Sequence, residues 1–450
     1  MNRDTIKRRL TEQETYTKKF LDKPLIQREH FSNYQKQLTT NLIKTILGPR
    51  RAGKTTLGLL LLKKTNFYYV NFDDEILSTL KREDLGGLLE LLNELFGKRP
   101  YLFLDEIQNI DSWELFVNRL QRLGYNILLS GSNSKLLSKE LSSHLGGRTL
   151  TLEILPFSFK EFLTAKHITT IKETDEEIGR IKNQLQEYLQ WGGYPEIIID
   201  LSDSDLRKKY LNELFDTIIF RDITQRFNIK YTAELVALAT VIINQFSTRT
   251  SLTKISRDLE ISSHTIKKYL SYLEEAYLVV SSKKFSYKPR EMESSFRKYY
   301  CIDTGLINAK KTTLTKDFGK TLENTVAIEL RRRNIDLYYY MVDNKYEVDF
   351  VIGDSTAIKE VIQVVDDEKE IPRRETKTGI LACKKLHCHT LTIITWNTET
   401  KKLEGDITIQ NIPLWKWLTK KKIRLLTMTN RAPYGIAFSK SFQRGKKMLR

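Results

Sequence analysis

The stretch LGPRRAGKTTLGLLLL, residues 47–62, has the residue types and spacing of a phosphate-binding loop. Gly48 and Gly53 allow the backbone dihedrals of a tight loop and leave room for phosphate oxygens. Backbone N–H groups at the start of the next helix add partial positive charge. Lys54 would reach the β- and γ-phosphates, and the Thr55 hydroxyl would bind magnesium. The pattern predicts an ATP site made of Gly48, Pro49, Arg50, Arg51, Ala52, Gly53, Lys54, Thr55 and Thr56.

A second motif, YLFLDEIQ at residues 101–108, is an apolar strand that ends in two carboxylates. We expect Asp105 to hold Mg²⁺, directly or through water, and Glu106 to orient and deprotonate the attacking water. The downstream strand NILLSGSN ends in Ser132 and Asn133, either of which could sense the γ-phosphate. Arg148 has two open interpretations, namely a catalytic arginine finger that completes a neighbouring subunit's site or a plain surface arginine.

These residues need a scaffold, and strands alternate with amphipathic helices between residues 40 and 165. That alternation predicts a parallel sheet with helical crossovers. Residues 173–245 are mostly helical in pattern, and a second block of strands follows a long helix after residue 318.

Residues 251–280 have the pattern of a helix-turn-helix. Apolar residues at helical spacing predict two short helices, with Ser262 or Ser263 as the N-cap of the second. That second helix has the position that enters a DNA major groove, and the ribbon over 276–303 has the length of a wing. Docking onto protein is the open alternative. The exposed face of the second helix is expected to carry His264, Lys267, Lys268 and Tyr272.

The motifs GPRRAGKTT, NFDDE, YLFLDEIQNI, LLSGSNSKLLSKEL, LPFSFKEFL and GGYPE occur in this order along the chain. They resemble the AAA-type ATPases, mostly archaeal and bacterial, that carry a C-terminal domain of unknown function. DTIIFRDI and RKYYCIDTGLIN are similar to markers of that second module, and EVDFVI and IPLWKWL match its end. The resemblance runs from about residue 20 to 418.

The resemblance implies an ATPase core, a winged helix and a restriction-endonuclease-like domain. The expected fold class is α/β, with a P-loop NTPase core of the AAA type, a helical lid, a winged helix-turn-helix and a C-terminal restriction-endonuclease-like α/β domain. The expected segments are 1–35 (N-terminal lead-in), 36–172 (ATPase core), 173–245 (helical lid or linker), 246–310 (winged helix), 311–418 (nuclease-like domain) and 419–450 (basic tail).

Nucleases of the restriction-endonuclease type need a helix glutamate, a strand aspartate and a Glu-x-Lys on the next strand, because carboxylates hold magnesium and the lysine helps to activate water. Here the third motif reads Gln363-Val364-Val365, so an amide replaces one carboxylate and the lysine is missing. We expect the cleavage activity to be lost and the fold to bind DNA backbone or to pack on its neighbours. The candidate residues of this degenerate site are Glu323, Glu347, Asp349 and Gln363.

Composition sets the class of protein and of partner. No apolar run reaches the roughly 18 residues of a membrane span. The first fifteen residues are rich in charge and have no apolar signal core, and the three cysteines make no disulfide framework, so we expect a cytoplasmic protein without a membrane partner. The net charge is +18, and residues 420–450 hold ten Lys or Arg and no Asp or Glu. Such a tail is typical of a solvated segment or of a nucleic-acid arm.

Two functions of different classes remain. The first is an ATP- and Mg²⁺-dependent ATPase that binds or remodels DNA, in a homo-oligomer if Arg148 completes a neighbour's site. The second is an ATP-controlled switch that binds a protein partner. An active ATP-regulated nuclease is a third interpretation, and it depends on a site that lacks two of its groups.

Overall fold

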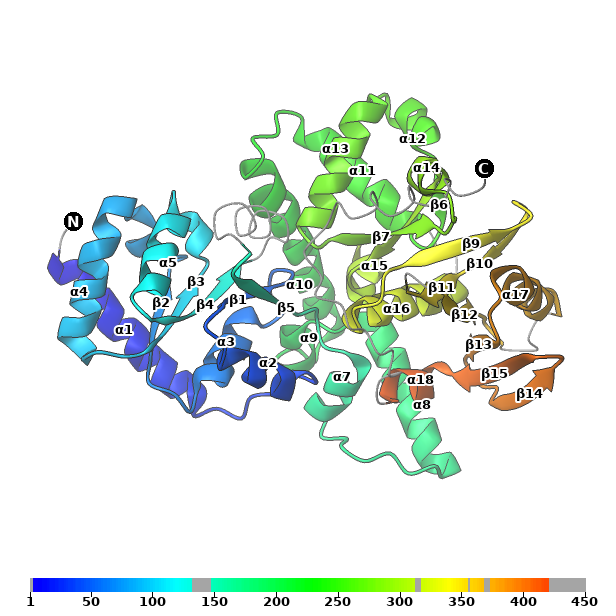
Figure 1. Cartoon of the computed structure of the whole chain (residues 1–450), viewed down its shortest axis with the longest axis horizontal. Coiled ribbons are helices and arrows are strands. Elements are labelled where there is room, and N and C mark those ends of the chain that lie inside the picture. The colour runs from blue at the N-terminus through cyan, green and yellow to red at the C-terminus, as the bar shows by residue number, and fades with distance from the viewer. Residues whose placement is uncertain (1–2, 132–146, 312–316, 355–356, 368–372, 421–450) are drawn as a thin grey trace, which may run out of the picture.

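The computed structural model describes residues 3–131, 147–311, 317–354, 357–367 and 373–420, and Figure 1 shows the arrangement of their elements. The first sheet is parallel, with strand order β2-β3-β4-β1-β5. Its apolar runs are buried because helices cover the sheet, as the alternating pattern predicts. The strands are β1 (Ile43–Leu47), β2 (Phe67–Asn71), β3 (Tyr101–Asp105), β4 (Asn126–Gly131) and β5 (Thr149–Glu153).

Helices precede and separate these strands. The N-terminal segment is more than a polar lead-in, because Ile6 and Leu10 are buried and their helix packs on β2 and on a later helix. The elements of this part are α1 (Arg3–Leu21), α2 (Phe31–Leu38), α3 (Lys54–Leu62), η1 (Leu77–Thr79), η2 (Arg82–Asp84), α4 (Leu85–Phe96), η3 (Ile107–Asn109) and α5 (Trp113–Arg122).

A helical segment follows the first sheet, as the sequence pattern indicates. One part of it, the segment η4, has π-helical hydrogen bonding and continues directly from the helix before it. In Figure 1 these helices are drawn in shades of green, and part of the segment lies between the first sheet and the rest of the chain. They are α7 (Phe159–Ala165), α8 (Asp175–Trp191), α9 (Pro195–Ile199), α10 (Ser204–Thr217), η4 (Ile218–Gln225) and α11 (Thr232–Asn244).

The second sheet has the order β10-β9-β7-β8-β6. Strands on both sides of residue 310 therefore share one sheet, since β7 pairs in parallel with β9. The helix-turn-helix pattern forms as expected, and Ser262 is the N-cap of the second helix. The elements are β6 (Arg249–Thr250), α12 (Leu252–Leu259), α13 (Ser263–Glu275), β7 (Val279–Lys284), α14 (Pro289–Ser294), β8 (Arg297–Cys301), β9 (Tyr338–Val342) and β10 (Tyr346–Val348).

The third sheet has the order β11-β12-β13-β15-β14, and its first strand follows β10. Asp349 is the single residue between β10 and β11, so the chain changes sheets at this position. The remaining elements are α15 (Thr304–Lys310), α16 (Phe318–Arg332), β11 (Phe350–Gly353), β12 (Ile358–Val364), α17 (Arg373–Leu386), β13 (Thr390–Thr395), β14 (Thr400–Glu404), β15 (Ile407–Pro413) and α18 (Leu414–Thr419).

Candidate nucleotide site and its relatives

The phosphate-binding loop lies between β1 and α3, at the carboxyl edge of the parallel sheet. Gly53 has φ 86° and begins α3 as its N-cap, a conformation that favours glycine. A Cβ on Gly48 would lie 2.0 Å from the carbonyl oxygen of Ile154, so only glycine fits there. The sequence pattern thus predicted correctly where backbone freedom and close approach are needed.

Lys54, the first residue of α3, is buried, and its ammonium donates to the carbonyl oxygens of Gly48 (3.2 Å) and Pro49 (3.0 Å). Burial lowers the pKa of this ammonium, and the charges of Glu106 and Asp105 act in the opposite direction. The loop itself therefore holds the lysine, and no carboxylate hydrogen-bonds to its Nζ among the described contacts.

A buried arginine supports the loop from the segment between α1 and α2. Arg28 donates to the carbonyl oxygens of Ala52 (2.9 Å) and Leu155 (2.5 Å) and to the carboxylate of Glu161 (2.9 Å). Burial alone would raise the pKa of Glu161, but Arg28 and then Arg332 outweigh burial and the pKa is lowered. The residues around the loop are thus tied to α7.

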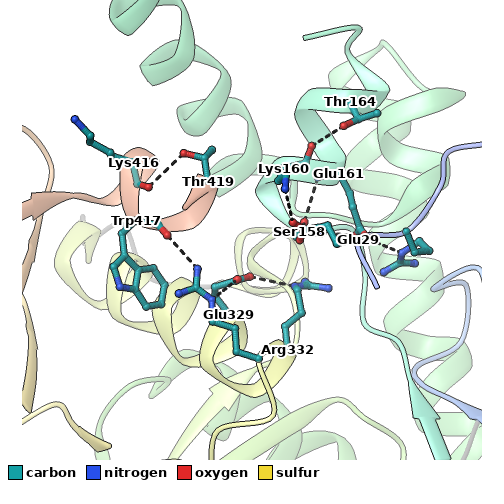
Figure 2. A network of polar contacts seen from close by, with 12 residues as sticks. Glu29, Ser158, Lys160, Glu161, Thr164, Glu329, Arg332, Lys416, Trp417 and Thr419 are labelled. Atoms are coloured by element: carbon teal, nitrogen blue, oxygen red, sulfur yellow. Dashed lines mark hydrogen bonds and ion pairs between the residues drawn. The ribbon is translucent and has the colours of Figure 1, made fainter. Parts of the chain in front are cut away.

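Figure 2 shows the wider polar network on both sides of α7. Ser158 caps α7 by accepting from the backbone N–H of Glu161, and its hydroxyl donates to Glu29 at 2.7 Å. Across from it on α16, Arg332 donates to Glu329 at 3.2 Å. The charges of Arg332 and Glu161 act on each other across this boundary, so the first domain and α16 meet through charged groups.

The carboxylate of Asp105 lies at the end of β3 and is 2% exposed. It accepts hydrogen bonds from Thr55 Oγ1 (2.7 Å), from the Tyr69 hydroxyl (3.0 Å) and from the Ser130 hydroxyl. The two residues predicted to hold magnesium, Thr55 and Asp105, are therefore in direct contact. Hydroxyl and carboxylate oxygens are the ligands that Mg²⁺ prefers, so the donor set fits this ion.

Glu106 follows with φ 51° and ψ 38°, a left-handed conformation that is strained for a non-glycine residue. Such strain costs about 1–3 kcal/mol and is found mainly at functional sites. The carboxylate of Glu106 accepts from the Gln108 amide. Burial raises its pKa, which the charge of Lys54 partly opposes.

Arg50 of the phosphate loop is bound to η4. Its Nη2 lies 2.7 Å from Asp222 Oδ1 and its Nε 3.0 Å from Asp222 Oδ2, which is a bidentate pair. Arg51 is exposed and lies 3.6 Å from Glu196 of α9. A cavity of about 430 Å³ opens beside the pair of Arg50 and Asp222. Its lining also includes Glu106, and Arg221 and Arg226 of the η4 region. Sequence reasoning had not connected η4 with the loop.

The other predicted residues of this site are less defined. Ser132 and Asn133 lie outside the described residues, as do residues 421–450 of the basic tail. Arg148 is exposed immediately before β5, so its role as a finger or as a surface residue stays a prediction.

The predicted DNA-binding residues share one helix. His264, Lys267 and Lys268 are exposed on α13, as expected. Tyr272, predicted for the same exposed face, is instead partly buried, because its ring stacks on Phe227 with 3.8 Å between centroids. Phe227 lies two residues after the end of η4, so segment 218–227, which binds Arg50 through Asp222, also contacts α13.

The residues of the degenerate nuclease site partly converge. Glu323, Glu347 and Asp349 meet at the ammonium of Lys298 on β8, a residue that the sequence analysis missed. The amide of Gln363 instead donates to Glu375 on α17 at 2.9 Å. One signal could have revealed Lys298. It is a lysine within the strand RKYYC, next to aromatic residues typical of a buried strand, and a buried lysine needs an acidic partner.

Among the described residues no helix is long and apolar enough to cross a membrane. The same residues contain no group of three His, Cys, Asp or Glu side chains placed to hold a metal, and Cys383 and Cys388 are buried thiols.

Comparison with known proteins gives the family. Residues 40–163 match the family described as an AAA domain, and residues 182–317 match a domain of unknown function, DUF8612. The uncharacterized protein MJ1544 of Methanocaldococcus jannaschii is 39% identical over 401 residues, covering 85% of this chain and 89% of that protein. An uncharacterized protein of Haemophilus influenzae is 32% identical over 351 residues, covering 74% and 84%.

Among solved structures, the Walker-type ATPase paby2304 of Pyrococcus abyssi aligns with a TM-score of 0.43 at 15% identity, over 64% of this chain and 96% of that one. The chain belongs to the same protein family as MJ1544 and the Haemophilus influenzae protein, and it contains a P-loop ATPase domain of the AAA type.

Proposed function

We propose that the protein hydrolyses ATP with Mg²⁺ at the loop and strand ends described above. Lys54 would bind the β- and γ-phosphates, and Thr55 with Asp105 would hold the ion. Magnesium bound there would neutralise phosphate charge. Glu106 would orient the attacking water and take its proton. The observation that carries this proposal is the direct contact of Thr55 with Asp105 at 2.7 Å, with Glu106 as the next residue.

The same proposal includes DNA binding. Residues 246–310 would form a winged helix that contacts DNA, and residues 311–418 would have a restriction-endonuclease-like fold. The exposed side chains His264, Lys267 and Lys268 on α13 support DNA backbone or groove contacts, because they lie on the helix that follows the turn. A finger role for Arg148 in a homo-oligomer belongs to the same proposal.

Segment 218–227 supports a coupling between the two activities. Its Asp222 binds Arg50 of the phosphate loop, and its Phe227 stacks on Tyr272 of α13. A displacement of Arg50 by bound phosphate would therefore shift a segment that also positions α13. This is a physical connection of two contacts, both of which can be removed by substitution.

The test measures ATP hydrolysis by the full chain with Mg²⁺, alone and with linear, forked and four-way DNA, together with DNA affinity across a range of salt. Lys267→Glu with Lys268→Glu should weaken DNA binding and reduce the slope of log affinity against log salt by about 2. The matched control is Lys208→Glu with Lys209→Glu, two adjacent exposed lysines on α10. Equal effects of both pairs would refute DNA contact by α13.

A second candidate is an ATP-controlled switch for a protein partner. It is favoured by exposed apolar side chains around the coupling segment, since Phe220 is 49% exposed and Tyr231 67% exposed. This function predicts slow hydrolysis that none of the three DNA substrates changes. A rate that rises several-fold with DNA would exclude it as the main role.

A further inference from the structure

A buried lysine, Lys298, is surrounded by three carboxylates from residues 311–418, which we call the C-terminal unit. The Nζ of Lys298 on β8 lies 2.5 Å from Glu323 Oε1, 2.8 Å from Glu347 Oε1 and 3.7 Å from Asp349 Oδ1. The lysine side chain is 1% exposed. The three acidic residues come from different places, namely helix α16, strand β10 and the bend before β11.

Glu347 and Asp349 each bind a further group through their second oxygen, and Glu323 Oε1 accepts a second hydrogen bond. Glu347 Oε2 lies 3.0 Å from Arg249 Nε, and Asp349 Oδ2 accepts the backbone N–H of Val364 at 2.8 Å. The Tyr300 hydroxyl donates to Glu323 Oε1 at 2.7 Å. Counted as ionised, three carboxylates face two cations and leave one negative charge. Burial lowers the pKa of Lys298, but the surrounding acidic groups outweigh burial and raise it well above the ordinary value.

The divalent ion implied by a nuclease-like fold does not fit these residues. Mg²⁺ requires near-octahedral oxygen ligands at about 2.0–2.1 Å, and an ammonium among the same carboxylates would repel it. Gln363, the fourth predicted ligand, donates its amide to Glu375 instead. The described residues contain no group of three acidic, histidine or cysteine side chains arranged for a metal.

We infer that Lys298 takes the place of the metal ion and that the cluster is an ionic interlock between β8 and the C-terminal unit. A second contact joins the same elements, because the Asn324 amide of α16 bonds both the N–H (2.8 Å) and the carbonyl oxygen (2.9 Å) of Cys301 on β8. Together with the pairing of β7 and β9, the interlock makes the helix-turn-helix unit and the C-terminal unit one rigid body. The inference is independent of the ATP site.

The test uses the full chain without nucleotide, in an Asp105→Asn background that removes the other oxygen site. Mn²⁺ alone is the probe, and bound Mn²⁺ is counted by electron paramagnetic resonance while thermal unfolding is recorded. With Lys298 present we expect no bound Mn²⁺. Lys298→Met should lower the melting temperature by several degrees, because the buried carboxylates of Glu323 and Asp349 and the half-buried one of Glu347 lose their cation, and Mn²⁺ should then raise it again.

A double variant, Lys298→Met with Glu323→Gln, serves as the test if the single variant does not fold. It removes one charge of each sign from the cluster. We expect the double variant to be more stable than the single one. One Mn²⁺ bound per chain with Lys298 intact, and lost in Asp349→Asn, would overturn the inference. A Lys298→Met chain as stable as its parent would overturn the interlock as well.

Discussion

Two buried sites in the described part of the chain combine a lysine with carboxylates, and the lysine has different partners in each. At the ATP site the ammonium of Lys54 bonds to two loop carbonyls, while Asp105 accepts from hydroxyl groups. At the interlock the ammonium of Lys298 on β8 bonds directly to Glu323 and Glu347.

The difference follows from the elements that carry the two lysines. Lys54 begins a helix after a glycine loop, so the loop backbone folds around its ammonium and supplies acceptors. Lys298 lies within a strand, where backbone carbonyls are used by the neighbouring strands β6 and β7, and only side chains remain as partners. A site that keeps its ammonium away from its carboxylates can accept an external cation, whereas a site that joins them is already neutralised.

The largest expected effect is at Glu106. Glu106→Gln should lower ATP turnover about 10²–10⁴-fold and retain ATP binding, because an amide cannot take the proton of water. Turnover and the dissociation constant for ATP are both measured. Glu114→Gln is the control, since Glu114 lines the same cavity. Similar losses in both variants would show that Glu106 is no special base.

Exchange of each lysine for methionine tests the comparison directly. Lys298→Met should cost about 3–5 kcal/mol of unfolding free energy, because it leaves buried carboxylates without their cation. Lys54→Met should cost less, because its partners are neutral carbonyls, but it should abolish hydrolysis. Denaturant unfolding and ATPase rates give the two values. A larger stability loss at Lys54 than at Lys298 would contradict the distinction drawn between the sites.

The pair of Arg50 and Asp222 is intermediate between the two lysine sites, because a single carboxylate holds a cation of the phosphate loop. Asp222→Asn should free Arg50 for phosphate and raise ATP affinity by up to about tenfold, roughly 1.4 kcal/mol. Asp216→Asn is the matched control, because Asp216 pairs with Lys310 at 3.0 Å, away from the loop. Titration of a fluorescent ATP analogue measures the affinity. A weaker affinity in Asp222→Asn would mean that Asp222 orients Arg50 toward the nucleotide.

The sequence predicts well those features that depend on neighbours along the chain. The phosphate loop, the parallel strands and the Ser262 cap each follow from a few consecutive residues, because local geometry and hydrogen bonding determine them. The pair of Thr55 and Asp105 also follows, since the loop after β1 and the end of β3 both lie at the carboxyl edge of the parallel sheet.

Long-range contacts escape such reasoning. Arg50 and Asp222 are 172 residues apart, and no spacing rule connects them. Lys298 lies on a strand that the sequence analysis assigned to the wing, so its approach to Glu323 depends on how two units join. Tyr272 was expected to be exposed because its helical face is polar, and Phe227 of another segment covers it.

The smallest effect concerns pH. Burial raises the pKa of Glu106, so as the pH is lowered the rate of hydrolysis should begin to fall above the ordinary glutamate pKa and then drop about tenfold per pH unit.

The charge of Lys298 changes at alkaline pH instead. Its pKa is raised above that of the unfolded chain, so its stabilisation is complete at neutral pH and is lost only as the pH rises through the folded value. Turnover and unfolding free energy measured on one pH series should therefore separate, turnover falling toward acid while the contribution of Lys298, taken as the difference from Lys298→Met, stays constant through neutral and mildly alkaline pH. A contribution of Lys298 that disappears near neutral pH would show that its ammonium is not held by the carboxylates.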